Sequence, residues 1–339
     1  MTTGVLLINL GTPNAPDVRS VRDYLDEFLM DPYVIDIPYP LRLLLVKGII
    51  LRFRPKASAK LYQKIWTEAG SPLLVISQQL KEKVSHALPN DYQVALAMRY
   101  GTPTITAALA TLMQQPLDKL IVIPLFPQYS QAATESAIQA FKSALTHYQH
   151  LPDVHIIEDF YNHPAFIEAY TKIIAAHFDI EHHDHLLMSY HGLPVKHLEK
   201  TGCQHVSKHC LDNIGCPNIS AQNARCYRAQ CYATTHAIAQ QLKLNSNQYS
   251  VSFQSRLGKT PWIKPYTDFH LPALYQQGIR RLAVVCPSFV ADCLETLEEI
   301  AIRAKEQWLE LGGECLTVIP CLNSNNAWVN AICTLCHAS

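Results

Sequence analysis

Short apolar runs alternate with longer amphipathic stretches along most of the chain. Runs such as LLINL, LIVIPL and HLLMSY are each followed within a few residues by glycine or proline. Continuous apolar runs of this length are typical of parallel strands buried on both faces, and the stretches between them are long enough for helical crossovers. The pattern therefore predicts an α/β protein.

The pattern of the first half returns in the second half. Four segments recur in the same order, which indicates two copies of one structural unit. Each copy is expected to be a Rossmann-like domain with a four-stranded parallel sheet flanked by helices, and the domains span 1–160 and 161–339. The pairs are LLINLGTP (6–13) with LLMSYHGLP (186–194), ALAMRYGTPTI (95–105) with VSFQSRLGKTPWI (251–263), LDKLIVIPLFPQYSQAATES (117–136) with IRRLAVVCPSFVADCLETLEE (279–299), and VHIIEDFYNHPAFIEAY (154–170) with CLTVIPCLNSNNAWVNAI (315–332).

Composition removes several classes of function. The 339 residues carry a formal net charge of zero, without the basic excess that nucleic-acid binding requires. No loop after a predicted strand reads GxGxxG or GxxxxGK[ST], so a nucleotide cofactor is not expected. The start, MTTGVLLINLGTP, resembles a buried strand and not a signal peptide, and no apolar run reaches the ~18 residues of a spanning helix. A cytoplasmic protein is expected.

One segment, residues 39–54 (YPLRLLLVKGIILRFR), is unusually apolar and is punctuated by cations. We call it the lip. It is too short and too charged to span a bilayer, but it suits a helix lying at a membrane interface. The alternative is a core helix whose cations extend outward, and Lys47-Gly48 is expected to interrupt the helix. The lip indicates peripheral membrane contact or an apolar mouth for a flat ligand.

Candidate reacting groups follow two predicted strands. Rossmann-like sheets bind ligands beyond the carboxyl ends of their strands, so the site is expected there, in the crevice between the domains. His191 ends HLLMSY, and imidazole titrates near neutrality. Glu295 and Glu299, one helical turn apart in ADCLETLEEI, would share a face that could pass a divalent cation or protons. Acids at a helix start are also common without any function.

Several of these motifs together resemble the ferrochelatase family. They are LINLGTP, YQKIWTEAGSPL, LFPQYS, SYHGLP, QSRLGKTPW and FVADCLETLEEI, and they cover nearly the whole chain in order. The resemblance implies two pseudo-symmetric domains that hold a porphyrin between them, a hydrophobic lip, and a lyase that inserts Fe²⁺ into protoporphyrin IX in the last step of haem synthesis.

The resemblance also implies roles for individual residues. His191 would be the proton acceptor or a metal ligand, and Glu295, with Asp292 and Glu299, would form the acidic line that leads metal or protons to the same centre. Arg99 would meet a propionate. The positions expected to line the porphyrin are Leu10, Arg99, Tyr129, Ser130, Trp262 and Phe289.

The sequence departs from the family pattern at three places. Cys293 stands where many members have a second histidine, so a ligand there would be softer. Leu10 stands where coproporphyrin-using members tend to have tyrosine, which favours protoporphyrin. Gln131 stands where animal members place a cysteine ligand of their 2Fe–2S cluster, so that arrangement does not transfer, although Cys333 and Cys336 echo part of it.

Eleven cysteines all follow residue 202, and four of them lie in an apparent insertion, residues 201–226. Their spacing does not match the CxxC pairs of zinc ribbons. Four thiolates suit a 2Fe–2S cluster, as in some bacterial ferrochelatases, or zinc, with His205 or His209 able to replace one thiolate. Disulfides are disfavoured in a reducing compartment. The expected ligands are Cys203, Cys210, Cys216 and Cys226, in a mainly structural role, whereas Cys231 belongs to the scaffold.

Three other functions remain open. A related chelatase could insert metal into coproporphyrin or an anionic corrin precursor such as sirohydrochlorin. A non-catalytic protein could bind or deliver porphyrin on the same scaffold. An iron–sulfur regulatory protein could have lost catalysis. The lip and the two-domain length argue against the first, and the presence of His191 and Glu295 argues against the second. Mutation of the four cysteines would distinguish the third, because it should change a partner interaction in a protein that inserts no metal.

Overall fold

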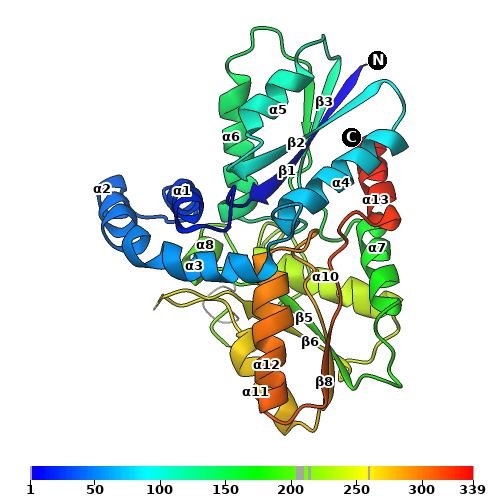
Figure 1. The fold of residues 1–339 in the computed structure, drawn as a ribbon. Helices are drawn as coiled ribbons and strands as arrows, with labels where there is room; N and C mark the ends of the chain where they lie inside the picture. The colour runs from blue at the N-terminus through cyan, green and yellow to red at the C-terminus, as the bar shows by residue number, and fades with distance from the viewer. Residues whose placement is uncertain (1, 204–209, 213–214, 259, 339) are drawn as a thin grey trace. The chain divides into compact units, whose positions relative to one another are not determined.

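The computed structural model describes residues 2–203, 210–212, 215–258 and 260–338. The chain divides into two compact units (Figure 1). The N-terminal unit contains residues 1–126, 131–159 and 324–339, and the C-terminal unit contains residues 127–130 and 160–323.

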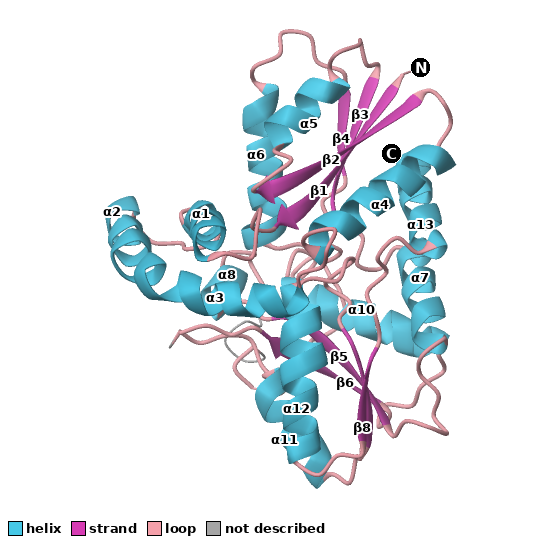
Figure 2. Cartoon of the chain, viewed as in Figure 1, coloured by secondary structure: helices cyan, strands magenta, loops and turns pink. Residues whose placement is uncertain are grey.

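The N-terminal unit is built on a four-stranded parallel sheet in the order β2-β1-β3-β4. Two helices, α5 and α6, cover one face, where Leu6, Ile8 and Phe141 share a buried core, and α4 and α13 cover the other (Figure 2). The elements are β1 (Thr3–Gly11), β2 (Tyr92–Tyr100), β3 (Lys119–Pro124), β4 (Asp153–Ile156), α4 (Pro72–Ala87), α5 (Ile105–Leu112), the π-helix η2 (Gln131–Glu135), α6 (Ser136–Leu145) and α13 (Asn326–Ala338).

A helical excursion follows β1 in the same unit. It consists of α1 (Val18–Leu29), α2 (Tyr39–Leu43), the π-helix η1 (Leu44–Ile50) and α3 (Leu51–Ile65). The interruption expected at Lys47-Gly48 is wrong, because both residues lie inside η1 and the helix runs on into α3. A π-turn closes i to i+5, so the chain widens locally without breaking the helix.

The C-terminal unit repeats this plan. Its parallel sheet has the order β6-β5-β7-β8, which matches the first sheet strand for strand and confirms the α/β fold class predicted from the repeats. One face packs on α11, η3 and α12 around Leu187, Val284 and Trp308. The elements are α7 (Pro164–Ala175), β5 (His185–His191), α8 (Val195–Glu199), α10 (Tyr227–Gln241), β6 (Tyr249–Gln254), α11 (Thr267–Gln276), β7 (Arg281–Val285), the π-helix η3 (Glu295–Ala304), α12 (Lys305–Glu310) and β8 (Cys315–Val318).

The boundary lies one residue earlier than predicted, before Phe160, and the observed units differ from the predicted domains at two further places. Residues 127–130 belong to the C-terminal unit, and 324–339 belong to the N-terminal unit. The second difference arises because α13 contributes its buried face, which includes Trp328, Ile332 and Cys336, to the N-terminal unit beside α4. A helix is assigned by what its apolar face packs against, which the linear repeat does not contain.

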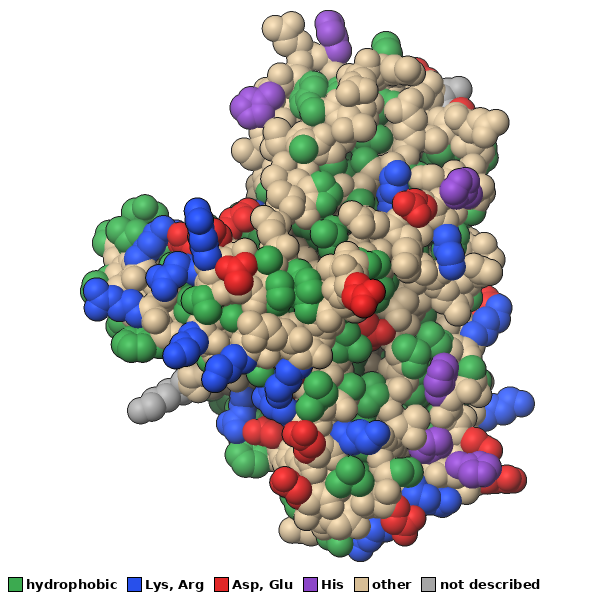
Figure 3. Space-filling model, viewed as in Figure 1, with side chains coloured by type: hydrophobic (Ala, Val, Ile, Leu, Met, Phe, Trp, Pro, Cys, Tyr) green, Lys and Arg blue, Asp and Glu red, His purple; other side chains and the backbone are tan. Residues whose placement is uncertain are grey.

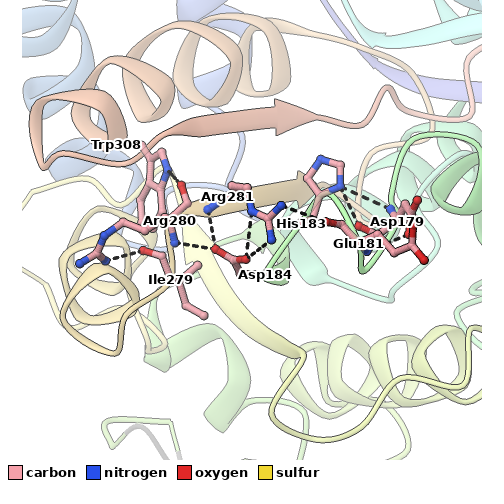
Figure 4. A network of polar contacts seen from close by, with 8 residues as sticks. All are labelled: Asp179, Glu181, His183, Asp184, Ile279, Arg280, Arg281 and Trp308. Carbon is pink, nitrogen blue, oxygen red and sulfur yellow. Dashed lines mark hydrogen bonds and ion pairs between the residues drawn. The ribbon is translucent and has the colours of Figure 1, made fainter.

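Asp184 joins the amino ends of β5 and β7 (Figure 4). Its carboxylate accepts hydrogen bonds from the backbone N–H groups of Arg280 and Arg281, at 2.9 and 2.8 Å, and from the Arg281 guanidinium at 2.7 Å. Trp308 of α12 donates its indole N–H to the Arg280 carbonyl at 3.1 Å. These contacts fix the amino ends of the strands, whereas His191 lies at the carboxyl end of β5. Their role is therefore structural.

Candidate functional site

His191 is the last residue of β5 and is held through its backbone. Its N–H donates to the Ser288 hydroxyl at 3.0 Å, and its carbonyl accepts from the Tyr227 hydroxyl at 2.9 Å. The imidazole Nδ1 lies 2.6 Å from the Gly192 carbonyl oxygen, so Nδ1 carries the proton and Nε2 is left as the basic nitrogen. The ring is half-buried.

Two aromatic rings flank this imidazole. The Trp262 ring centroid lies 6.4 Å from that of His191, and the Phe289 centroid lies 6.1 Å away, edge to face. The loop of Trp262 is fastened to the loop after His191, because Ile263 donates its N–H to the Leu193 carbonyl at 3.0 Å. Gly192 is required between them, since a Cβ there would lie 2.7 Å from the Gln254 carbonyl and 3.2 Å from the Trp262 ring. The structure thus brings three predicted site residues together.

Glu295 and Glu299 lie on η3, a π-helix and not the α-helix that the sequence predicts. Ser255 donates its backbone N–H to Oε1 of Glu299 at 2.8 Å and its hydroxyl to Oε2. Burial raises the pKa of Glu299, against the opposing effect of these hydrogen bonds and of Arg303. Ser255 holds the left-handed φ of +68°, which a non-glycine residue adopts at a cost. The Glu299 carboxylate is therefore fixed in orientation.

Glu295 lies beside Cys293. Burial, followed by the charge of the Glu295 carboxylate and the hydrogen bond that this carboxylate accepts from the thiol, raises the pKa of Cys293. Gln254, at the end of β6, donates its side-chain amide to the Glu295 carbonyl at 2.9 Å. The first turn of η3 is thus attached to the end of β6.

Asp292 has a structural environment. Its Oδ1 accepts from the Thr296 hydroxyl at 2.9 Å and from the Cys321 N–H at 3.3 Å, and its Oδ2 accepts from the Asn323 amide at 2.7 Å. The residue is only 9% exposed. Because Asp292 is buried and both of its carboxylate oxygens accept hydrogen bonds, it is less available to a metal than the half-buried Glu295 and Glu299.

A cavity of ≈ 420 Å³ opens beside the end of β6. Glu299 and Arg303 line it, and Arg303 reaches both Glu298 (2.7 Å) and Glu299 (3.9 Å). Arg256 and Asp268 also line it and form an ion pair at 2.8 Å. Carboxylate oxygens that line an open cavity are suitable ligands for a hard divalent cation.

Tyr129 and Ser130 belong to the same unit and are 5% and 6% exposed. The Tyr129 N–H donates to the Gln230 side chain at 2.6 Å, and the Arg225 guanidinium lies 4.1 Å from the Tyr129 ring centroid. Gln230 is itself fully buried in α10. Residues 127–130 are thus anchored to α10.

Leu10 and Arg99 belong to the N-terminal unit. Leu10 is half-buried near the end of β1. Arg99, near the end of β2, forms an ion pair with Asp31, whose side chain is 1% exposed, and donates Nε to the Ser136 hydroxyl at 2.7 Å. Part of the Arg99 charge is therefore already neutralised within its own unit.

Comparison with known proteins decides the family. A family model for ferrochelatase matches residues 2–339. Ferrochelatase of Legionella pneumophila is 52% identical over 332 residues, which cover 98% of each chain, and that of Coxiella burnetii is 50% identical over 336 residues, which cover 99% of this chain and 93% of the other. The chain belongs to the ferrochelatase family. It is therefore a metal chelatase of haem biosynthesis with Fe²⁺ as a substrate.

A solved structure supports the fold alone. A multi-domain protein of Deinococcus radiodurans, described as structurally similar to chelatases, matches with a TM-score of 0.50 at 12% identity. The match covers 98% of this ferrochelatase-family chain and 54% of the other.

The four cysteines expected to bind a metal group carry suitable donor chemistry. Cys210 and Cys226 are 2% and 1% exposed. Burial, with the neighbouring charges of Cys216 and Cys203, raises the pKa of Cys210 to about 12, against the effect of Arg228, and a hydrogen bond with Cys203 raises that of Cys226. Arg228 donates to the Cys216 sulfur at 2.9 Å. The four thiols are thus close enough to interact, beside a guanidinium that favours anionic sulfur.

The donor set fits a thiolate-bound metal group, but the sulfurs do not form a finished site. Within the described residues, no group of three or more His, Cys, Asp or Glu side chains is arranged to hold a metal ion. His205 and His209 lie outside those residues. None of the eleven cysteines, all of which lie within the described residues, forms a disulfide, and Cys231 is fully buried in α10.

The lip of this ferrochelatase-family member is an exposed apolar surface, so the core-helix alternative is wrong. Leu44 and Phe53 are 66% and 75% exposed, and Figure 3 shows hydrophobic surface beside Lys and Arg over α2 and its neighbours. Arg42 does not extend outward as expected; it is buried and donates to the Ile35 and Ile37 carbonyls, at 3.2 Å each. In the part of the chain that the structure describes, no helix has the length and apolarity to cross a membrane.

Sequence reasoning missed the groups that hold the site residues. Ser255, Tyr227, Ser288 and Asp31 were not assigned any role. Their sequence signal is weak, because a single hydroxyl or carboxylate becomes a partner only when the fold brings a distant backbone group beside it. Arg303 could have been found, since it follows Glu299 at the i+4 spacing of helical ion pairs.

Proposed function

We propose that the chain inserts Fe²⁺ into protoporphyrin IX, with His191 as the proton acceptor on the metal side and Glu295 on the route of metal or protons. Insertion requires two pyrrole protons to leave and the metal to shed water. The observation that carries the proposal is the fixed position of His191. Its backbone is hydrogen-bonded to Ser288 and Tyr227, and its imidazole lies beside Trp262 and Phe289.

The orientation of the imidazole supports a basic role. With the proton on Nδ1 directed at the Gly192 carbonyl, Nε2 is free to accept a pyrrole proton or to bind metal. The aromatic side chains of Trp262 and Phe289 offer faces to a flat macrocycle. Imidazole and macrocycle would then meet on one surface of the C-terminal unit.

The acids of η3 supply the metal side of the proposal. Glu299, oriented by Ser255, and Glu295, beside Cys293, offer oxygen ligands to Fe²⁺ in transit. Asp292 would act by holding the start of η3, since its oxygens cap Thr296, Cys321 and Asn323. This assigns Asp292 a positioning role within the acidic line.

The remaining porphyrin contacts are proposed from the family resemblance. Leu10 in place of a tyrosine favours protoporphyrin over coproporphyrin. Arg99 would bind a propionate as a second anion beside Asp31, which is possible because a guanidinium offers five N–H donors. Tyr129 and Ser130 would line the macrocycle.

His191→Ala tests the function directly. We expect kcat for Fe²⁺ insertion to fall by a factor of about 10² or more, because a positioned general base contributes that much. Porphyrin affinity, measured by fluorescence quenching, should change little. The matched control is His236→Ala, an exposed histidine of α10 in the same unit. Turnover of the His191 variant close to that of the parent would remove its assigned role.

Two further results separate the alternatives. Glu295→Gln should raise KM for Fe²⁺ more than KM for porphyrin, because it removes a metal-side group. A parent protein that binds porphyrin tightly but inserts no metal would support a porphyrin carrier instead. Faster turnover of coproporphyrin or sirohydrochlorin than of protoporphyrin would indicate the related chelatases.

We also propose that Cys203, Cys210, Cys216 and Cys226 hold a 2Fe–2S cluster, or zinc as the alternative. Interactions among the four thiols, together with the guanidinium of Arg228 beside Cys210 and Cys216, support this. The group would cross-link a segment with few apolar residues, so its contribution is structural stabilisation. The exposed lip similarly supports the proposal of a cytoplasmic protein in peripheral contact with a membrane.

A further inference from the structure

Arg303 is a charged residue beside Glu299 to which the proposed chemistry assigns no role. It lies near the end of η3 and lines the ≈ 420 Å³ cavity together with Glu299. Its Nε donates to Oε2 of Glu298 at 2.7 Å, while its Nη2 lies 3.9 Å from Oε2 of Glu299. One guanidinium therefore neutralises two carboxylates that differ in exposure, since the side chains of Glu298 and Glu299 are 1% and 23% exposed.

We propose that Arg303 is a resident cation on the metal route: its guanidinium occupies the cavity side of the Glu299 carboxylate, and incoming Fe²⁺ has to displace it. Arg303 thereby sets the apparent affinity of the protein for its metal substrate. This inference rests on the proposed role of Glu299 in the metal route.

The hydrogen bonds of Glu299 show which partner can move. Ser255 binds both oxygens of the carboxylate from the end of β6, through a backbone N–H and a hydroxyl. Arg303 contributes only a long contact of 3.9 Å from a side chain that is 53% exposed. A loose, solvated ion pair of this kind is weak, so it can open while the Ser255 contacts stay.

Charge and size decide the competition at Glu299. A divalent cation carries twice the charge of the guanidinium and concentrates it on one atom, so it can displace Arg303 from an oxygen ligand. The guanidinium can turn Nη2 away from Glu299 toward solvent by rotating about the hydrogen bond from Nε to Glu298, because the Arg303 side chain is half-exposed. The free energy needed to displace Arg303 lowers the apparent affinity for Fe²⁺ and therefore raises KM for the metal.

The main test is Arg303→Gln in a Glu298→Gln background. The background change matters because Arg303→Gln alone would leave the buried Glu298 carboxylate without this partner and could unfold the helix. Relative to E298Q, the double variant should lower KM for Fe²⁺ about fivefold in anaerobic assays. KM for porphyrin should not change, and any change in kcat should be smaller than the change in KM for Fe²⁺.

A second readout is direct binding of Mn²⁺ to the protein without porphyrin. The electron paramagnetic resonance signal of the free ion measures how much Mn²⁺ remains unbound. Mn²⁺ prefers oxygen ligands and is poorly suited to the cysteine thiols. The double variant should bind Mn²⁺ more tightly than E298Q. A guanidinium that merely stabilised the helix would change the melting temperature and leave Mn²⁺ binding as it was.

Arg256→Gln is the matched control. Arg256 lines the same cavity and has the same charge, but it pairs with Asp268 at 2.8 Å and stacks over Tyr266 and Phe269. If R256Q lowers KM for Fe²⁺ as much as the double variant does, the effect is the general potential of the cavity and the proposal is overturned. An unchanged or raised KM for Fe²⁺ in the double variant also overturns it.

Glu299→Gln separates this inference from the proposed function. If E299Q weakens Mn²⁺ binding and raises KM for Fe²⁺ while the Arg303 variant has no effect, the metal route stands and only the role of Arg303 is wrong. If E299Q changes neither quantity, Glu299 is not on the metal route. The proposed roles of Glu299 and Arg303 are then both wrong.

Discussion

At the scale of single residues, His185 shows how burial makes stability depend on pH. It begins β5, is 4% exposed, and lies 3.2 Å from the Asn247 carbonyl through Nδ1 and 2.8 Å from the Ser250 hydroxyl through Nε2. Burial, with a smaller effect of His270, lowers the pKa of His185 to about 4. In the unfolded chain the imidazole protonates near its ordinary value of about 6.5. The unfolded state therefore binds more protons between these values, and stability falls as pH drops from 6.5 toward 4.

His185→Gln should flatten this part of the stability profile. Glutamine can keep a donor to Asn247 and an acceptor for Ser250 but does not titrate. The free energy of unfolding of the parent should fall by up to roughly 3 kcal/mol between pH 7 and pH 4 because of His185. Most of this decrease should be absent in the variant. Urea unfolding at several pH values measures the difference. His236→Gln, at an exposed position, is the control and should follow the parent. If the stability of H185Q and of the parent falls in parallel with pH, this pH dependence does not come from His185.

Which residues form the site was partly predictable from the sequence, but their environments were not. Placing His191 at a strand end followed from HLLMSY, and the structure puts its ring beside Trp262 and Phe289. The capping role of Asp292 and the left-handed conformation of Ser255 depend on groups distant in sequence, such as Asn323 and Glu299. Local patterns cannot contain these contacts, because the partners come together only when the end of β6 and the segment after β8 pack against η3 and the residues before it.

At the scale of elements, the two segments with unusual sequences both contain π-helices. The lip contains η1, and the acidic segment forms η3. Both were predicted with α-helical geometry, since apolar and charged periodicity over about ten residues does not separate a repeat of 3.6 from the wider π-turn. The exposure of the lip could be predicted in part, because its apolar composition indicated a membrane interface or a ligand mouth. Most of its apolar side chains lie exposed, whereas Arg42, Val46 and Leu51 are buried.

Charge substitution on the lip tests the proposed membrane contact. Leu44→Glu and Phe53→Glu place carboxylates at positions 66% and 75% exposed, so they should not unfold the N-terminal unit. Co-sedimentation with anionic vesicles should weaken about tenfold or more for the pair, because two inserted apolar side chains are lost and negative charge is added. Leu151→Glu, 54% exposed in the same unit, is the control. Unchanged vesicle binding with a raised KM for porphyrin would instead identify the lip as the mouth of the porphyrin site.

At the scale of the whole molecule, the repeat explains where the special segments occur. Both sheets share one strand order, and in both units the connection from the first strand to the second in sequence is the long one. The lip lies between β1 and β2, and the cysteine segment, residues 201–226, lies between β5 and β6. Conserving the strand order preserves the packed sheets, while a long connection at the surface tolerates added residues. The sequence repeat predicted the sheets. It could not predict that α13 packs in the N-terminal unit, because its partner α4 is distant in sequence.

This arrangement predicts what removal of the cysteine-bound group would do. The strands of both units lie outside residues 201–226, so Cys210→Ala should change far-ultraviolet circular dichroism little while abolishing the bound group. Anaerobically purified parent should show the visible bands of a red-brown protein together with iron and acid-labile sulfide, and C210A should lose all three. Cys333→Ala, a half-buried cysteine of α13, is the control and should keep them. A colourless parent with stoichiometric zinc would replace the cluster by a zinc cross-link, and loss of the bands in C333A would transfer the ligands to the C-terminal helix.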